Sequence, residues 1–93
     1  MDVTTVVIDT ESIDDIFNEP DQYVDSASDR SLIEIWGNGK TLFTVYIGVE
    51  ESGEVYLMLE DEETSEMFTP ESNETLWDVY QRATDKWIAL SES

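Results

Sequence analysis

The chain has 93 residues, of which 23 are acidic and 4 are basic, so its formal net charge at pH 7 is -19. This length gives a single domain, and 40% hydrophobic residues exclude an intrinsically disordered acidic tail. A domain of this size usually carries a net charge of roughly 2–8 in magnitude, so a cationic partner, metal ions or high salt should offset the self-repulsion.

The N-terminal third predicts a strand followed by a short helix. Residues 3–8 are rich in β-branched side chains, which favour a strand. Asp9 and Thr10 offer capping side chains to a helix over residues 11–17, which carries one apolar stripe and ends at Pro20. The polar segment 25–30 predicts a loop.

The middle of the chain predicts a three-stranded antiparallel meander. Asn38-Gly39 lies between β-prone runs at residues 31–36 and 41–49, and this dipeptide is the strongest short-range hairpin signal. After a second turn, apolar residues alternate through 54–59, so both faces of that strand carry apolar surface and one face needs a cover.

The C-terminal segment predicts that cover, a long amphipathic helix that begins at residues 69–70 or at a cap within 72–73. Asp78 and Arg82 are spaced as a supportive i, i+4 ion pair. The fold is therefore an α+β domain over residues 1–93, in the order β-α-β-β-β-α, with helices packed on one face of an antiparallel sheet. The helix stripe consists of Leu76, Tyr80, Ala83, Trp87 and Leu90.

Catalysis has little support in this composition, and the chain is predicted not to be an enzyme. It has no histidine to act as a base and no cysteine, and Lys40 and Lys86 are expected to serve ion pairing. Gly37 and Gly39 frame a turn and do not open a phosphate-binding helix. The acids of residues 60–66 could attract Ca²⁺ or Mg²⁺ but lack the calcium-loop pattern, so no cofactor and no metal site is predicted.

The distribution of acids is the most informative feature. Carboxylates at i and i+2 of an extended strand lie about 6.5–7 Å apart, which suits imitation of successive nucleic-acid phosphates. A generic solubilising surface is the alternative. The acids gather at one turn, beyond the last strand and on the first helix, and the predicted partner-binding residues are Glu50, Glu51, Glu54, Glu60, Asp61, Glu62, Glu63, Glu66, Asp14, Asp15 and the turn-proximal Trp36.

Three aromatic positions are weighed between core packing and partner contact. Trp36 adjoins the hairpin turn, where a tryptophan can anchor an interface. Trp77 is one residue off the helix stripe, and Phe68 with Met67 follows the acid run. Packing at the core or its edge is the commoner fate of such residues.

The pattern resembles two classes of small acidic protein. Acid clusters on a small α+β domain resemble the inhibitor proteins of phages and mobile elements, which include DNA mimics and anti-CRISPR proteins. The order of elements resembles immunity proteins of bacterial toxins: Thr4-Thr5-Val6-Val7-Ile8-Asp9, then Ser12-Ile13-Asp14-Asp15-Ile16-Phe17, then a sheet from Ser31-Leu32-Ile33-Glu34-Ile35-Trp36 through Glu54-Val55-Tyr56-Leu57-Met58-Leu59. Acid-rich, lysine-poor domains of salt-adapted organisms are a third class, in which charge is a solvation adaptation.

The resemblance implies a non-enzymatic inhibitor whose partner is a basic protein, a nucleic-acid-binding enzyme. Direct binding to nucleic acid or to an anionic membrane is disfavoured, because phosphate repels this surface. Without a signal peptide or an apolar span, the expected location is the cytoplasm, that of the host cell for a phage protein. A homodimer is expected if an exposed edge strand, 3–8 or 55–59, pairs with its copy.

Overall fold

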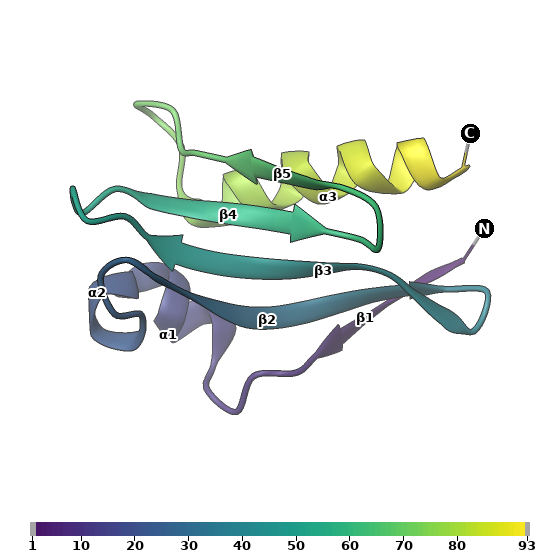
Figure 1. Ribbon diagram of the computed structural model, residues 1–93, viewed down its shortest axis with the longest axis horizontal. Helices are drawn as coiled ribbons and strands as arrows, with labels where there is room; N and C mark the ends of the chain where they lie inside the picture. Colours follow the sequence, from purple (N-terminus) through teal and green to yellow (C-terminus); the bar gives the residue numbers. More distant parts are fainter. Residues whose placement is uncertain (1, 93) are drawn as a thin grey trace.

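The computed structural model describes residues 2–92. They form a five-stranded antiparallel sheet whose spatial order follows the chain, together with three helices (Figure 1). The α+β class predicted from the sequence is confirmed. In chain order the elements are β1 (Val3–Val7), α1 (Ile13–Asn18), α2 (Pro20–Tyr23), β2 (Ser28–Gly37), β3 (Lys40–Val49), β4 (Val55–Glu60), β5 (Ser65–Phe68) and α3 (Leu76–Glu92).

The predicted hairpin joins the two longest strands, β2 and β3. Asn38 and Gly39 have φ angles of 56° and 79°, and both must be positive in a two-residue hairpin turn. Gly37 pairs with Lys40 directly before and after this turn. The turn sets the register of the first pairs of these ten-residue strands, and Leu42 of β3, an extra residue between the Trp36–Thr41 and Ile35–Phe43 pairs, shifts it by one. β2 begins at Ser28, so the predicted loop 25–30 is wrong in its second half.

β2 also carries a bulge at Leu32. Ser31 pairs with Tyr46 and Ile33 pairs with Val45, so Leu32 is an extra residue between two consecutive pairs. Leu32 and Ile33 are consequently both buried, at 0% and 3% exposure. Strict alternation along a strand would have buried only one of them.

Two short elements were not predicted. Pro20 does not merely end the first helix, because it is the first residue of α2. β5 pairs antiparallel with β4, so residues 55–59 belong to an interior strand and the prediction of an edge there is wrong. The edges of the sheet are β1 and β5.

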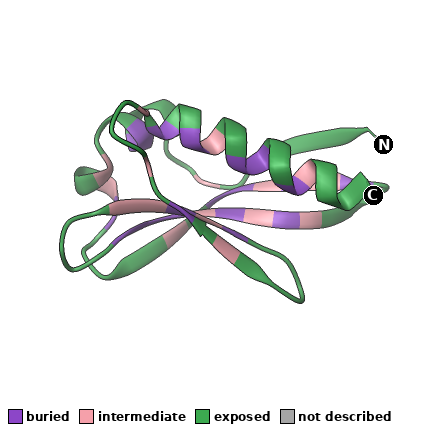
Figure 2. Cartoon of the chain, turned by 90° about the horizontal axis from the view of Figure 1, so that it is seen from above, coloured by how far each residue is buried: buried purple, intermediate pink, exposed green. Residues whose placement is uncertain are grey.

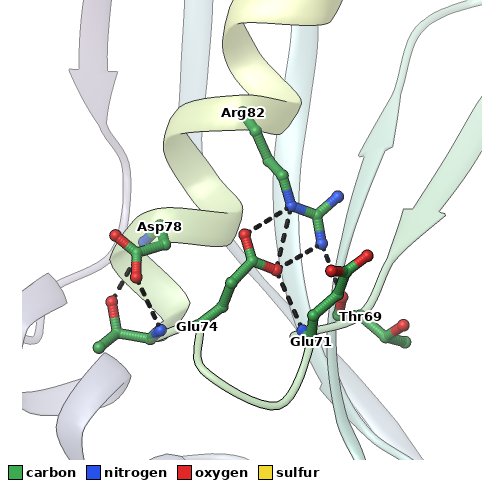
Figure 3. Close-up of polar contacts among 6 residues, drawn as sticks. Thr69, Glu71, Glu74, Asp78 and Arg82 are labelled. Carbon is green, nitrogen blue, oxygen red and sulfur yellow. Dashed lines mark hydrogen bonds and ion pairs between the residues drawn. The ribbon is translucent and has the colours of Figure 1, made fainter.

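α3 begins at Leu76, later than predicted, because Thr75 and Asp78 cap it reciprocally. The Thr75 N–H donates to Asp78 Oδ2 at 3.0 Å, and the Asp78 N–H donates to Thr75 Oγ1 at 3.2 Å. Arg82 does not form the expected pair with Asp78. It instead binds Glu74, at 2.9 Å between Nε and Oε2, and the Thr69 carbonyl at 2.7 Å (Figure 3).

The hydrophobic core lies between the sheet and the helices. The Trp87 ring meets the Phe43 ring edge-on at 5.4 Å between centroids, and Phe17 of α1 meets Trp77 of α3 at 4.8 Å. The buried stripe of α3 faces the sheet in Figure 2. Leu90 is wrongly predicted on this stripe: it is 61% exposed and borders a shallow groove beside the β4–β5 turn. We call the sheet face that carries Phe43 and its alternate neighbours the covered face; its buried side chains include Ile35, Phe43, Val45, Ile47, Leu57, Leu59 and Phe68.

Candidate functional site

The opposite side of the sheet, which we call the open face, carries aromatic and acidic side chains together. Except at the bulges of Leu32 and Leu42, its residues alternate with those of the covered face along each strand. In Figure 2, α1 and α3 lie on the other side of the sheet. Most of these side chains are only partly buried. The open face includes Thr4, Val6, Asp29, Glu34, Trp36, Thr44, Tyr46, Tyr56, Met58, Glu60 and Met67.

Two carboxylates of the open face are aligned across three strands. Thr44 of β3 pairs with Glu34 of β2 on one side and with Glu60 of β4 on the other. At the usual strand spacing, the Cα atoms of these two acids are about 10 Å apart. The strand register therefore places a row of acids across the sheet, where the sequence had suggested a row along one strand.

Tyr46 adjoins this row and is itself half-buried. Burial of the phenol raises its pKa, and the charges of Glu60, Asp29 and Glu34 raise it further. Tyr46 therefore stays a hydroxyl donor at neutral pH, with acids on both neighbouring strands, β2 and β4. This combination gives an apolar, aromatic surface under a negative potential.

Trp36 is fixed on the same face near the hairpin turn. Its indole Nε1–H donates to Glu34 Oε1 at 3.1 Å. Together with Thr4, Val6 and the hairpin turn it lines a shallow groove of about 360 Å³. The tryptophan predicted as an interface anchor is thus half-buried and bonded to an open-face acid.

The Tyr56 ring covers a glycine of the neighbouring strand. Gly48 pairs with Tyr56, and a Cβ built on Gly48 would lie 2.2 Å from the Tyr56 ring. Only a glycine leaves space for this ring. The ring in turn covers backbone that would otherwise be bare.

A group of acids lies where the β4–β5 turn meets the start of β3, and we call residues 60–63 the turn acids. Glu60 ends β4, and the other three lie in the turn, so they do not form the extended i, i+2 row that the sequence suggested. Asp61 Oδ1 accepts the N–H groups of Glu63 and Thr64 at 2.8 and 2.7 Å, which lowers the Asp61 pKa. Asp61 therefore holds the turn in shape while Glu62 and Glu63 project into solvent.

The other predicted acids lie at the opposite end of β4, roughly 17 Å away along the strand. Glu50, Glu51 and Glu54 belong to the β3–β4 turn and are all exposed. Asp14 and Asp15 are exposed in the first turn of α1. The predicted partner-binding acids thus fall into separate groups at the β4–β5 turn, at the β3–β4 turn and on α1, and the first of these adjoins the open face through Glu60.

Glu66 has a different environment from the other predicted acids. It accepts a bond from Lys86 Nζ at 2.7 Å and one from Trp87 Nε1 at 2.9 Å. These two hydrogen bonds lower the Glu66 pKa. Glu66 fastens β5 to α3, so its charge is largely used within the fold.

Three of the four basic side chains are likewise engaged by carboxylates. Lys86 binds Glu66, Arg82 binds Glu74, and Arg30 binds both Asp9 oxygens through Nε and Nη2, with 2.7 Å between Nη2 and Oδ1. Burial opposes ionisation of Asp9, but hydrogen bonds from Arg30 and from the Glu11 N–H outweigh it and lower the Asp9 pKa. Little positive charge is left to offset the exposed acids.

Sequence reasoning missed Asp29, Glu34 and Tyr46 as members of the site. Alternation along β2 places Glu34 on the same face as Trp36, whereas counting from the Asn38-Gly39 turn fails for Tyr46, because the extra residue Leu42 shifts the register. Asp29 could not be found in this way, since it lies before the Leu32 bulge.

Within residues 2–92, no three carboxylates are grouped so as to hold a metal ion. No helix in the same range has the length and apolarity needed to cross a bilayer. Comparison of the chain with protein-family models, with curated proteins and with solved structures finds no match.

Proposed function

We propose that this protein is a non-enzymatic inhibitor, active in the cytoplasm, that binds the positively charged nucleic-acid-binding surface of a partner enzyme. The open face and the turn acids form the contact surface. Blocking is by occupancy, and the protein contributes no chemistry of its own.

The supporting observation is the strand register, which brings Glu34 and Glu60 to either side of Thr44 on a half-buried face that also carries Tyr46. Acids on β2 and β4 act on one phenol, and Arg30, Arg82 and Lys86 are bound elsewhere, which leaves Lys40, beside the turn acids, as the remaining base. A groove lined by Lys and Arg to hold a nucleic acid offers complementary charge. Aromatic rings among the carboxylates add cation–π contacts with arginine and lysine.

The field also favours rapid encounter. Complementary charge raises association rates to about 10⁸–10⁹ M⁻¹s⁻¹ at low salt, and salt screens this gain. Binding should therefore weaken steeply as ionic strength rises, and nucleic acid should compete with the protein for the same surface.

The first experiment identifies the partner. The tagged protein is incubated with lysate at about 0.1 M salt, where the Debye length is about 10 Å. Retained proteins are then identified by mass spectrometry. We expect one basic nucleic-acid-binding enzyme that is released by higher salt and by added nucleic acid. Retention of abundant basic proteins alone would contradict the proposal, and unfolding of the protein at low salt would favour the solvation reading of its charge.

A pair of matched variants then tests the surface. Glu60→Gln/Glu62→Gln/Glu63→Gln neutralises the turn acids but keeps Asp61, which builds the turn. We expect binding to weaken about tenfold and to depend less on salt. The control Glu50→Gln/Glu51→Gln/Glu54→Gln removes equal charge at the other end of β4.

The outcomes discriminate clearly. A larger loss for the control triple would move the contact to the β3–β4 turn. Unchanged binding by both triples would refute the electrostatic proposal. Retention of a toxin in place of a nucleic-acid-binding enzyme would assign the same surface to an immunity protein.

A further inference from the structure

β1 is an edge strand without charge in a highly charged chain. It pairs with β2 only, and all five of its residues are exposed. Residues 3–8 contain no acid or base, and Val3, Val7 and Ile8 are 37%, 53% and 41% exposed. Natural edge strands usually carry charges, prolines or bulges that prevent pairing. The described part of β1 has none of these protections.

The backbone of β1 has one free hydrogen-bonding edge. The Ile8 N–H donates to the Leu32 carbonyl at 2.9 Å, so Ile8 is oriented toward β2. In an antiparallel ladder this orientation repeats every second residue, which makes Val6 and Thr4 face β2 as well. The N–H and C=O groups of Val3, Thr5 and Val7 therefore point away from the sheet.

We infer that β1 is a dimerisation edge, which pairs antiparallel with β1 of a second copy and joins two five-stranded sheets into one. A two-fold axis at Thr5 sets Thr5 opposite its copy and Val3 opposite Val7 of the second copy. This register overlays the uncharged runs and places Asp2 across from Ile8 of the second copy. Each outward-facing residue exchanges hydrogen bonds with its opposite residue.

The distribution of charge identifies a second copy as the occupant. Two chains of charge -19 repel one another, and most of their surface would bring carboxylate against carboxylate. β1 can meet its copy without that juxtaposition. The Val3–Val7 pairs are self-complementary, as a two-fold interface requires, and lie on the side where Thr5 bonds Tyr80 of α3.

This inference is independent of the proposed function, and salt separates the two. Screening weakens the repulsion between two acidic copies, so dimerisation should strengthen as salt rises. Binding to a basic partner should weaken over the same range. The two proposals can therefore fail separately.

Analytical ultracentrifugation at about 0.05 and 0.5 M salt, which spans Debye lengths of roughly 14 to 4 Å, tests the dimer. We expect the 10.7 kDa chain to sediment as a dimer at high salt. Val7→Pro removes an outward N–H without removing a bond to β2, so it should give a folded monomer. Val7→Ala shortens the same side chain but keeps the N–H, and it should remain a dimer.

Amide hydrogen exchange provides a readout that needs no variant. The N–H groups of Thr5 and Val7 should exchange about tenfold or more slowly in the dimer than after dilution to monomer. The inference would be overturned if the protein were a monomer at both salt concentrations or if Val7→Pro were a folded dimer. It would also be overturned if the exchange rates of these amides did not change with protein concentration. If the protein is a monomer and Val7→Pro abolishes binding to the partner enzyme, β1 instead contacts that enzyme.

Discussion

The covered face and the open face of the sheet are built from the same strands but differ in how far their side chains are exposed. On β3, Phe43, Val45 and Ile47 are each at most 1% exposed, whereas Thr44 and Tyr46 between them are only partly buried. The covered face excludes water and charge. The open face keeps aromatic surface accessible among carboxylates. The period-two geometry of a strand thus lets adjacent residues be assigned to stability and to recognition.

The largest expected effect comes from removing a ring on the covered face. Phe43→Ala should lower the free energy of unfolding by about 3–5 kcal/mol, because it leaves a cavity beneath Trp87. Tyr46→Ala on the open face should cost only about 1 kcal/mol. Urea unfolding followed by circular dichroism measures both, and equal losses would refute the division between the faces.

A second comparison neutralises one carboxylate that is bound within the fold and one that is exposed on the open face. Asp9→Asn leaves the Arg30 guanidinium without its anion and should cost about 2 kcal/mol. Glu60→Gln removes an exposed charge from a strongly acidic protein, so it should not lower the urea midpoint. A lower midpoint for Glu60→Gln than for Asp9→Asn would contradict this assignment.

The sign of the pH dependence follows from the lowered Asp9 pKa. The ionised carboxylate stabilises the folded state, so its contribution is fully present above the unfolded pKa of about 4. It is lost as the pH falls through the lower pKa of the folded protein. Asp9→Asn should therefore flatten the loss of stability below pH 4, and acid unfolding of the two proteins measures the difference.

The smallest expected effect concerns packing on the open face. Gly48→Ala places a methyl group in the Tyr56 ring, which must swing aside, and should cost about 1 kcal/mol. In a Tyr56→Ala background the same change should be neutral or stabilising, since alanine suits a strand better than glycine. A double-mutant cycle with no coupling would show that the ring does not depend on Gly48.

The sequence was most informative where short-range chemistry decides the structure. Asn38-Gly39 determined the hairpin, and the β-branched run at residues 3–8 predicted β1 correctly. β5 was missed because four residues with one buried side chain, Phe68, give almost no periodic signal. The start of α3 was placed too early because Pro70 is compatible with a helix start, whereas the reciprocal Thr75–Asp78 bonds decide it.

The candidate site was only partly predictable. The acid groups are evident in the sequence, and their exposure to solvent could be predicted from their charge. Which acids adjoin the aromatic face depends on register between strands, and the Glu34–Thr44–Glu60 row joins residues far apart in the chain. Glu66 was assigned to the partner-binding set because nothing local reveals that Lys86 and Trp87 reach it from α3.

The Leu32 bulge sets the sign of charge on each face of β2. If Leu32 paired in step with its neighbours, the four residues before it would exchange faces. Arg30 would then project among the carboxylates of Glu34 and Glu60, and Asp29 would turn toward the core. The one extra residue keeps Arg30, the only arginine of the sheet, beside Asp9. It thereby leaves Asp29, Glu34 and Glu60 on the open face without an arginine among them.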